Sequence, residues 1–180
     1  MKDQQSTSTR TLIWKQPKFG VDHYELRAGE KLIGELYWTK WFSDRAIARC
    51  RSGEWEFDRV GCLRQRVLAI DSCTGKQAAS FEIGWFYEGD IHLANGKIYQ
   101  WYRTKAFSSA WAIVDEQDKL VYEIQIGNRW FKHEASVSLA VNNQYPELDL
   151  LICLGLYLGI CTMQDAAAAV AATASTVAVM

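Results

Sequence analysis

The sequence predicts a mainly β protein: a closed antiparallel barrel of about twelve strands around a central hydrophobic helix near the C-terminal end. Two observations support this fold class. Short apolar runs recur about every ten residues as far as Val141, with turn-forming residues between them, as in an antiparallel meander. A strongly apolar helix then follows at 146–163. A meander of this length favours a sandwich or a barrel, and a barrel leaves no exposed sheet edge.

The individual strands are expected to pair as hairpins. Their connections contain Asn-Gly, Gly-Lys or acidic residues, as at Asn95-Gly96 and Asp115, which are typical of tight turns. In 122–126, apolar and polar residues alternate, so one face of that strand is expected to point inward. The predicted strands are 23–27, 32–38, 46–50, 54–58, 67–70, 78–83, 91–93, 98–102, 111–114, 120–126 and 135–141.

The C-terminal helix is apolar around its whole circumference, so it is expected either inside protein or in lipid. Its uncharged run, 150–163, would span about 21 Å as a helix, which is short of the ~30 Å core of a bilayer. A longer span would have to include Gln164 and Asp165. We therefore expect the helix to be buried inside the barrel, with a membrane anchor as the alternative.

The chain is predicted to hold one domain with two tails. Residues 1–10 are polar and expected to be disordered, 11–163 form the barrel with its helix, and the Ala-rich residues 164–180 are expected to be flexible. Gly155 and Gly159 match the GxxxG pattern. That spacing predicts close approach of strand backbones in a barrel, or helix dimerisation in a membrane.

Charge and cysteine content limit the class of protein. The formal net charge of −1 argues against a nucleic-acid partner, because such proteins usually carry a basic excess. The five cysteines are odd in number, and the polar N-terminal segment does not resemble a signal peptide. These features predict free thiols and a cytoplasmic protein, with association to a membrane surface as an extension of that prediction.

The candidate binding site is a cluster of arginines. Guanidinium groups bind phosphate oxygens in a bidentate manner, so such a cluster indicates an anionic phospholipid headgroup. The alternative is that Asp44, Glu54, Glu56 and Asp58 neutralise these arginines in cross-strand pairs. The candidate residues are Arg45, Arg49, Arg51, Arg59, Arg64 and Arg66.

Aromatic residues offer a second set of candidates, because eight Trp, eight Tyr and seven Phe are unusual for a chain of this length. They could line a carbohydrate or lipid site, or they could fill the space between a barrel wall and its helix. The residues considered are Trp38, Trp41, Phe42, Trp55, Trp85, Phe86, Trp101, Tyr102 and Trp111.

The chain resembles the tubby C-terminal-like superfamily, which includes the LURP-one-related proteins and the phospholipid scramblases. The resemblance lies in two similar hairpins, 67–81 and 112–122, in which an apolar run, an Asp and a short turn precede a second apolar run. It also lies in the strand count and the closing apolar segment 146–158. The resemblance implies a closed barrel threaded by a helix. Tubby binds phosphoinositides through basic residues on the barrel wall, but those residues have no one-for-one match here. The cysteine-rich and calcium-binding segments of scramblases are also missing from this sequence.

Motifs for catalysis and metal binding are absent from the sequence. His23, His92 and His133 are far apart, and the chain contains no CxxC pair, no HExxH, no GxSxG and no P-loop. We therefore expect no enzymatic activity, no metal and no cofactor.

The sequence as a whole predicts a non-enzymatic binding module. Its expected partner is an anionic phospholipid or a protein at a membrane surface, and nucleic acid is not expected. Two alternatives remain open at this point. The chain could be a tail-anchored membrane protein with a cytosolic β-domain, or a barrel whose mouth binds a small molecule.

Overall fold

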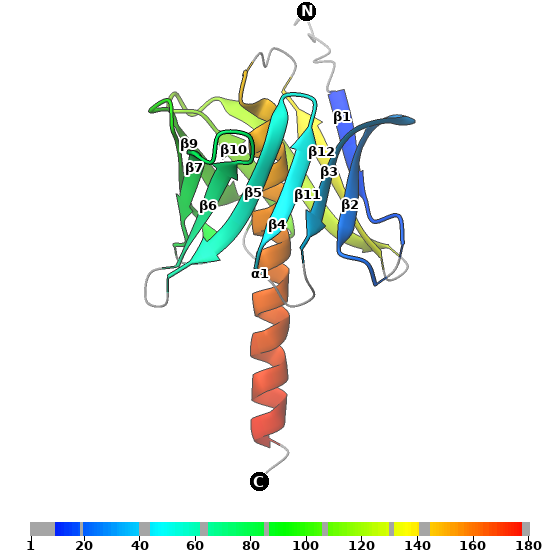
Figure 1. Ribbon diagram of the computed structural model, residues 1–180. Coiled ribbons are helices and arrows are strands. Elements are labelled where there is room, and N and C mark those ends of the chain that lie inside the picture. Colours follow the sequence, from blue (N-terminus) through cyan, green and yellow to red (C-terminus); the bar gives the residue numbers. More distant parts are fainter. Residues whose placement is uncertain are drawn as a thin grey trace, which may run out of the picture.

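Twelve strands form a closed barrel around one C-terminal helix in the computed structural model, which confirms the predicted fold class (Figure 1). The structure describes residues 10–18, 20–39, 44–61, 65–84, 87–105, 108–129, 132–140 and 145–177. The strands are β1 (Arg10–Lys15), β2 (His23–Ala28), β3 (Lys31–Trp38), β4 (Ala46–Cys50), β5 (Gly53–Val60), β6 (Arg66–Asp71), β7 (Gln77–Glu82), β8 (Gly89–Leu93), β9 (Ile98–Arg103), β10 (Ala110–Val114), β11 (Leu120–Arg129) and β12 (Lys132–Leu139), and the helix is α1 (Leu148–Val177).

Each strand pairs antiparallel with the next one along the chain, and β12 pairs with β1 to close the barrel. The closing pair runs from Arg10 opposite Leu139 to Lys15 opposite Glu134. The sequence did not predict β1. Residues 16–22 separate it from its neighbour β2 and lack the two-residue turn signal of a tight hairpin, and its other partner, β12, lies more than a hundred residues away. Without β1, strands β2 and β12 would each expose an unpaired edge.

Most strands differ from the sequence prediction by one to three residues at an end, and β5 and β12 are examples. β5 continues to Val60, because its pairing with β6 holds as far as the Val60–Arg66 pair. β12 begins at Lys132 and ends at Leu139, where 135–141 was expected. β12 pairs with β11 from Arg129 opposite Lys132 onward, so only two residues join the two strands. Because this connection is so short, β12 begins earlier than expected.

The core of the protein lies between the barrel wall and α1. Inward-facing strand residues are large and buried, and Trp14, Phe57 and Trp101 are completely shielded from solvent. Every residue from 150 to 161 is buried as well. The helix is therefore apolar on all sides because the wall surrounds it on all sides.

The helix continues beyond the barrel. It does not end at Met163, because its last described residue is Val177. No Gly or Pro follows Gly159, and alanine is the strongest helix former, so the Ala-rich sequence extends the helix. Residues 166–177 of α1, here called the projecting segment, leave one end of the barrel (Figure 1).

Two contacts define the ends of the barrel. At the entry end, where α1 begins, Ser52 in the β4–β5 turn donates a 2.7 Å hydrogen bond to Asp149. At the exit end, where α1 leaves, Arg59 on β5 donates a 2.8 Å hydrogen bond to Asp165. Consecutive strands alternate in direction, so every second connection lies at the exit end.

Gly155 and Gly159 bring α1 close to the wall. A Cβ atom at Gly155 would overlap the Tyr122 hydroxyl and crowd the Trp101 ring. That hydroxyl already donates a 2.6 Å hydrogen bond to the carbonyl oxygen of Leu151. A Cβ atom at Gly159 would overlap only the end of the flexible Ile126 side chain. The GxxxG spacing thus serves helix-to-strand packing in this barrel.

We predict that replacement by alanine destabilises the protein at Gly155 but not at Gly159. Alanine gains about 1 kcal/mol in helix propensity at either position. At Gly155 we expect overpacking against Tyr122 to exceed this gain, with a net loss of about 1–2 kcal/mol in the free energy of unfolding. Gly159→Ala should stay within about 1 kcal/mol of wild type, because Ile126 can change rotamer. Urea denaturation of both variants measures the difference, and equal stability of Gly155→Ala and wild type would contradict the packing argument.

Candidate functional site

The predicted arginine cluster is divided between the two ends of the barrel. Arg49 and Arg51 lie near the β4–β5 turn at the entry end, and Arg51 belongs to the turn itself. Arg45, Arg59 and Arg66 lie toward the exit end, at the start of β4, the end of β5 and the start of β6. Arg64 lies outside the described residues. The five described arginines therefore do not form one continuous patch.

Two of these arginines form ion pairs across neighbouring strands. Arg45 lies 3.1 Å from Glu56 and 3.3 Å from Asp58. Arg49 pairs with Glu54, and its guanidinium also lies 5.3 Å from the centre of the Tyr37 ring. Both arginine side chains are about half exposed, so solvent screens these ion pairs and each contributes little to stability. These carboxylates neutralise part of the predicted phosphate-binding surface.

Arg59 forms a different kind of contact, because only 10% of its side chain is exposed. Its guanidinium lies 3.0 Å from Asp44 and 2.8 Å from Asp165, and it donates a 3.1 Å hydrogen bond to the Tyr87 hydroxyl. Burial lowers the pKa of Arg59, but the hydrogen bond to Asp165 and the nearby charges outweigh this effect and raise it. The Arg59 cluster, comprising Arg59, Asp44, Tyr87 and Asp165, therefore fastens α1 to the wall where the helix leaves.

The projecting segment lacks ionisable side chains, and its described side chains are exposed. All side chains from 166 to 171 are exposed, and Val170 is 69% exposed. The chain carries no Asp, Glu, Lys, Arg or His after Asp165. By length and composition, Leu148–Ala171 could cross a membrane, but residues 150–161 within it are all buried inside the molecule. Among the described side chains of this helix, those from 166 to 171 are exposed and therefore available to an external apolar phase.

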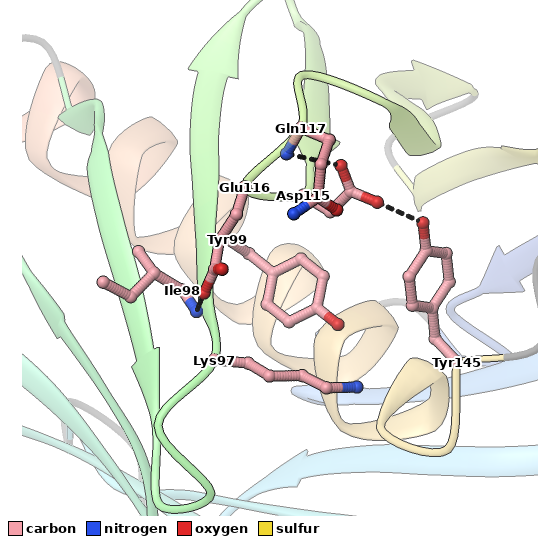
Figure 2. Close-up of a pocket in the computed structure, with 7 residues that line it drawn as sticks. All are labelled: Lys97, Ile98, Tyr99, Asp115, Glu116, Gln117 and Tyr145. Atoms are coloured by element: carbon pink, nitrogen blue, oxygen red, sulfur yellow. Dashed lines mark hydrogen bonds between the residues drawn. The ribbon is translucent and has the colours of Figure 1, made fainter.

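A cavity of about 180 Å³ opens at the entry end beside the start of α1 (Figure 2). Figure 2 shows the Tyr99 and Tyr145 rings facing the same space as Lys97. The two rings meet edge to face, with centroids 6.0 Å apart. The lining residues are Lys97, Ile98, Tyr99, Asp115, Glu116, Gln117 and Tyr145, which include no serine, cysteine or histidine.

The polar groups of this cavity bind one another. Tyr145 donates a 2.6 Å hydrogen bond to Asp115, Tyr99 donates to Glu147, and the Lys97 ammonium lies 2.7 Å from Glu147. Burial raises the pKa of Asp115, but hydrogen bonds from Tyr145 and from the amides of Lys119 and Gln117 outweigh it, so this pKa lies below its ordinary value. These mutual contacts close the barrel around the start of the helix.

The aromatic candidates divide between the core and the undescribed residues. Trp55, Trp101 and Trp111 are buried, and Trp38 stacks on Tyr157 of α1 with centroids 5.7 Å apart. These four tryptophans fill the space between wall and helix, as the second interpretation predicted. The Tyr102 side chain is 37% exposed. Trp41, Phe42, Trp85 and Phe86 lie outside the described residues.

Potential metal ligands do not gather within the described residues, where no three His, Cys, Asp or Glu side chains are placed to hold a metal ion.

The sequence contained only weak signals for the Arg59 cluster. Asp44 and Arg59 were both noted, but Tyr87 and Asp165 are distant in sequence and only the fold brings them together.

The fold and site define a class of protein: a closed twelve-stranded antiparallel barrel threaded by its own C-terminal helix. No protein-family model matches the chain, and a search of curated proteins found no significant match. Among solved structures, it is similar to the X-ray structure of a protein from Arabidopsis thaliana, with a TM-score of 0.50 and 12% sequence identity. The match covers 85% of this chain and 94% of the plant protein. This likeness shows a shared barrel fold.

We predict that Arg59 stabilises the fold much more than Arg45. Arg59→Met should lower the free energy of unfolding by about 1.5–3 kcal/mol, because it removes charged hydrogen bonds that join α1 to the wall. Arg45→Met removes pairs that are about half exposed and should cost less than ~1 kcal/mol. Thermal and urea denaturation of both variants test this difference. Equal losses would show that the Arg59 cluster does not fasten the helix.

Proposed function

We propose that this protein is a non-enzymatic binding module that attaches to a phospholipid membrane by the exit end of its barrel. The observation that carries the proposal is the projecting segment, a helix that continues out of the barrel, whose sequence is uncharged and whose side chains from 166 to 171 are exposed. A helix whose sides are all uncharged and exposed is unusual in water but suited to lipid. The proposed attachment is peripheral, with the barrel outside the bilayer.

The described part of the helix reaches a limited depth. Residues 166–177 extend about 18 Å as a helix, compared with the ~30 Å core of a bilayer. This part of the helix could therefore enter the bilayer but is too short to cross it. Asp165, held by Arg59, marks the boundary, because a carboxylate in an ion pair at the barrel end belongs at the polar surface of the membrane.

The connections between strands differ strongly in sequence between the two ends. In sequence, five of the six connections that join strands at the exit end contain Trp or Phe, and all eight of these Trp and Phe residues lie outside the described part of the chain. At the entry end, only the segment before α1 contains an aromatic residue, Tyr145. Tryptophan is enriched where proteins meet the membrane interface. The aromatic residues of the exit-end connections are Phe19, Trp41, Phe42, Trp85, Phe86, Tyr87, Phe107, Trp130 and Phe131.

Basic residues at the same end support a preference for anionic phospholipid. Lys15, Lys18, Lys105 and Arg66 lie at the exit end and are exposed. Each basic group near an anionic surface contributes about 1 kcal/mol at moderate salt concentration. Arg45 and Arg59 already bind carboxylates, so we expect the apolar contact to supply most of the affinity and the charges to supply selectivity.

We further propose that the chain is a divergent member of the tubby C-terminal-like superfamily. The strand order, the closed barrel and the helix inside it support this relation, as does the likeness to the plant structure. At 12% identity that likeness concerns the fold, so the proposed lipid contact rests on the residues of this chain.

Vesicle sedimentation tests the proposed membrane contact. Full-length protein should bind vesicles of phosphatidylcholine with phosphatidylserine, and bind vesicles of phosphatidylcholine alone more weakly. A truncated chain, 1–165, should stay folded by circular dichroism, because it keeps every buried residue of α1. We expect the truncated chain to lose at least tenfold in vesicle affinity.

A pair of point variants separates lipid contact from a general effect of charge. Val170→Asp places a carboxylate in the projecting segment, whereas Ser72→Asp places the same charge at the entry end. Only Val170→Asp should weaken vesicle binding, because a buried carboxylate is costly in lipid. Equal vesicle binding by full-length and truncated chains would refute the proposal. The proposal would also be refuted if the protein formed a dimer that depends on residues 166–180 and bound no vesicles. In that case the segment would pack against a second copy of the chain.

A further inference from the structure

Two cysteines, one on the barrel wall and one on the helix, meet near the entry end. Cys50 is the last residue of β4, and Cys153 lies in the second turn of α1, 103 residues further along the chain. Their Sγ atoms are 3.4 Å apart. That separation is only about 1.4 Å longer than a disulfide bond. We propose that Cys50 and Cys153 form a reversible disulfide that locks the helix into the barrel under oxidising conditions.

Neighbouring contacts hold both cysteines in this arrangement. Gly34 on β3 leaves the space that the Cys50 side chain occupies, because a Cβ atom there would overlap Cys50 Sγ. On the helix side, the hydrogen bond from Ser52 to Asp149 fixes the β4–β5 turn against the first turn of α1. Bond formation therefore requires the two sulfur atoms to move about 1.4 Å closer together.

The two sulfur atoms differ in access to solvent, and this difference sets the order of the chemistry. Cys50 is partly exposed, whereas Cys153 is completely buried. The contact with Cys50 and burial raise the pKa of Cys153 well above its ordinary value, so Cys153 remains a thiol at neutral pH. A small oxidant such as hydrogen peroxide would thus react first at Cys50.

The oxidation then proceeds in two balanced steps. The Cys50 thiolate attacks one oxygen of hydrogen peroxide, which gives a sulfenic acid at Cys50 and releases hydroxide. The sulfur of Cys153 next displaces the hydroxyl group from Cys50. The S–S bond forms, and the proton of Cys153 leaves with that hydroxyl as water. Two thiols are oxidised and one peroxide is reduced to two molecules of water. A dithiol reductant reverses the bond by exchange.

This bond would change how firmly the helix is retained. In the reduced protein, packing and the contacts at the two barrel ends hold α1. A cross-link between residues 103 positions apart also restricts the unfolded chain, and this stabilises the native state. We expect the melting temperature Tm to rise by roughly 5–10 °C on oxidation.

Oxidation of the purified full-length protein tests the inference. Reduced protein is treated with a small excess of hydrogen peroxide, alkylated, and analysed by intact mass and by peptide mapping without reductant. We expect a monomer that carries about two alkyl groups fewer than the alkylated reduced protein, with the peptides of Cys50 and Cys153 joined and Tm raised. Dithiothreitol should restore both the mass and the original Tm.

Matched serine variants identify the cysteines involved. Cys50→Ser should lose the joined peptide and the rise in Tm while its reduced form melts close to reduced wild type. Cys73→Ser changes an exposed thiol and should keep both effects. The inference fails if peroxide yields only intermolecular dimers through Cys73, or over-oxidised Cys50 without a joined peptide. It also fails if the joined protein melts no higher than the reduced one.

Discussion

The structure depends on one packing constraint: a closed barrel of twelve strands encloses a space that must be filled, and α1 fills it. The wall has no free edge only while β12 pairs with β1, and that closed circumference is wide enough to hold a helix. Glycines at Gly155 and Gly159 let the helix approach β9 and β11, and aromatic rings fill the wider gaps elsewhere. Neither the wall nor the helix can bury its apolar surface without the other.

Most of the fold could be predicted because its signals are local. Hairpin turns such as Asn95-Gly96 lie beside the strands they join, and the apolar circumference of the helix is visible in a single stretch of sequence. β1 was missed because its pairing with β12 is the longest-range contact of the sheet. The end of α1 was placed too early, because exposed alanine has high helix propensity but offers no apolar pattern to recognise.

The candidate site was less predictable than the fold. An arginine cluster can be read from the sequence, but the sequence does not tell which carboxylate each guanidinium binds. Arg59 and Asp165 are 106 residues apart, and the path of the helix alone places them together. The contrast between aromatic exit-end connections and polar entry-end connections becomes visible only when the strand order assigns each connection to an end.

The position of the core helix at the end of the chain has a consequence for biosynthesis. During translation all twelve strands leave the ribosome before the segment that fills them, so the nascent wall has apolar faces without their native partner. The pairing of β1 with β12 must also wait until most of the chain has been made, and contacts of such long range form slowly. Folding of this barrel therefore cannot be completed until α1 has been made. A ribosome that stalls or terminates before Leu148 releases a chain with a nearly complete sheet and no core, which is a substrate for chaperones and proteases.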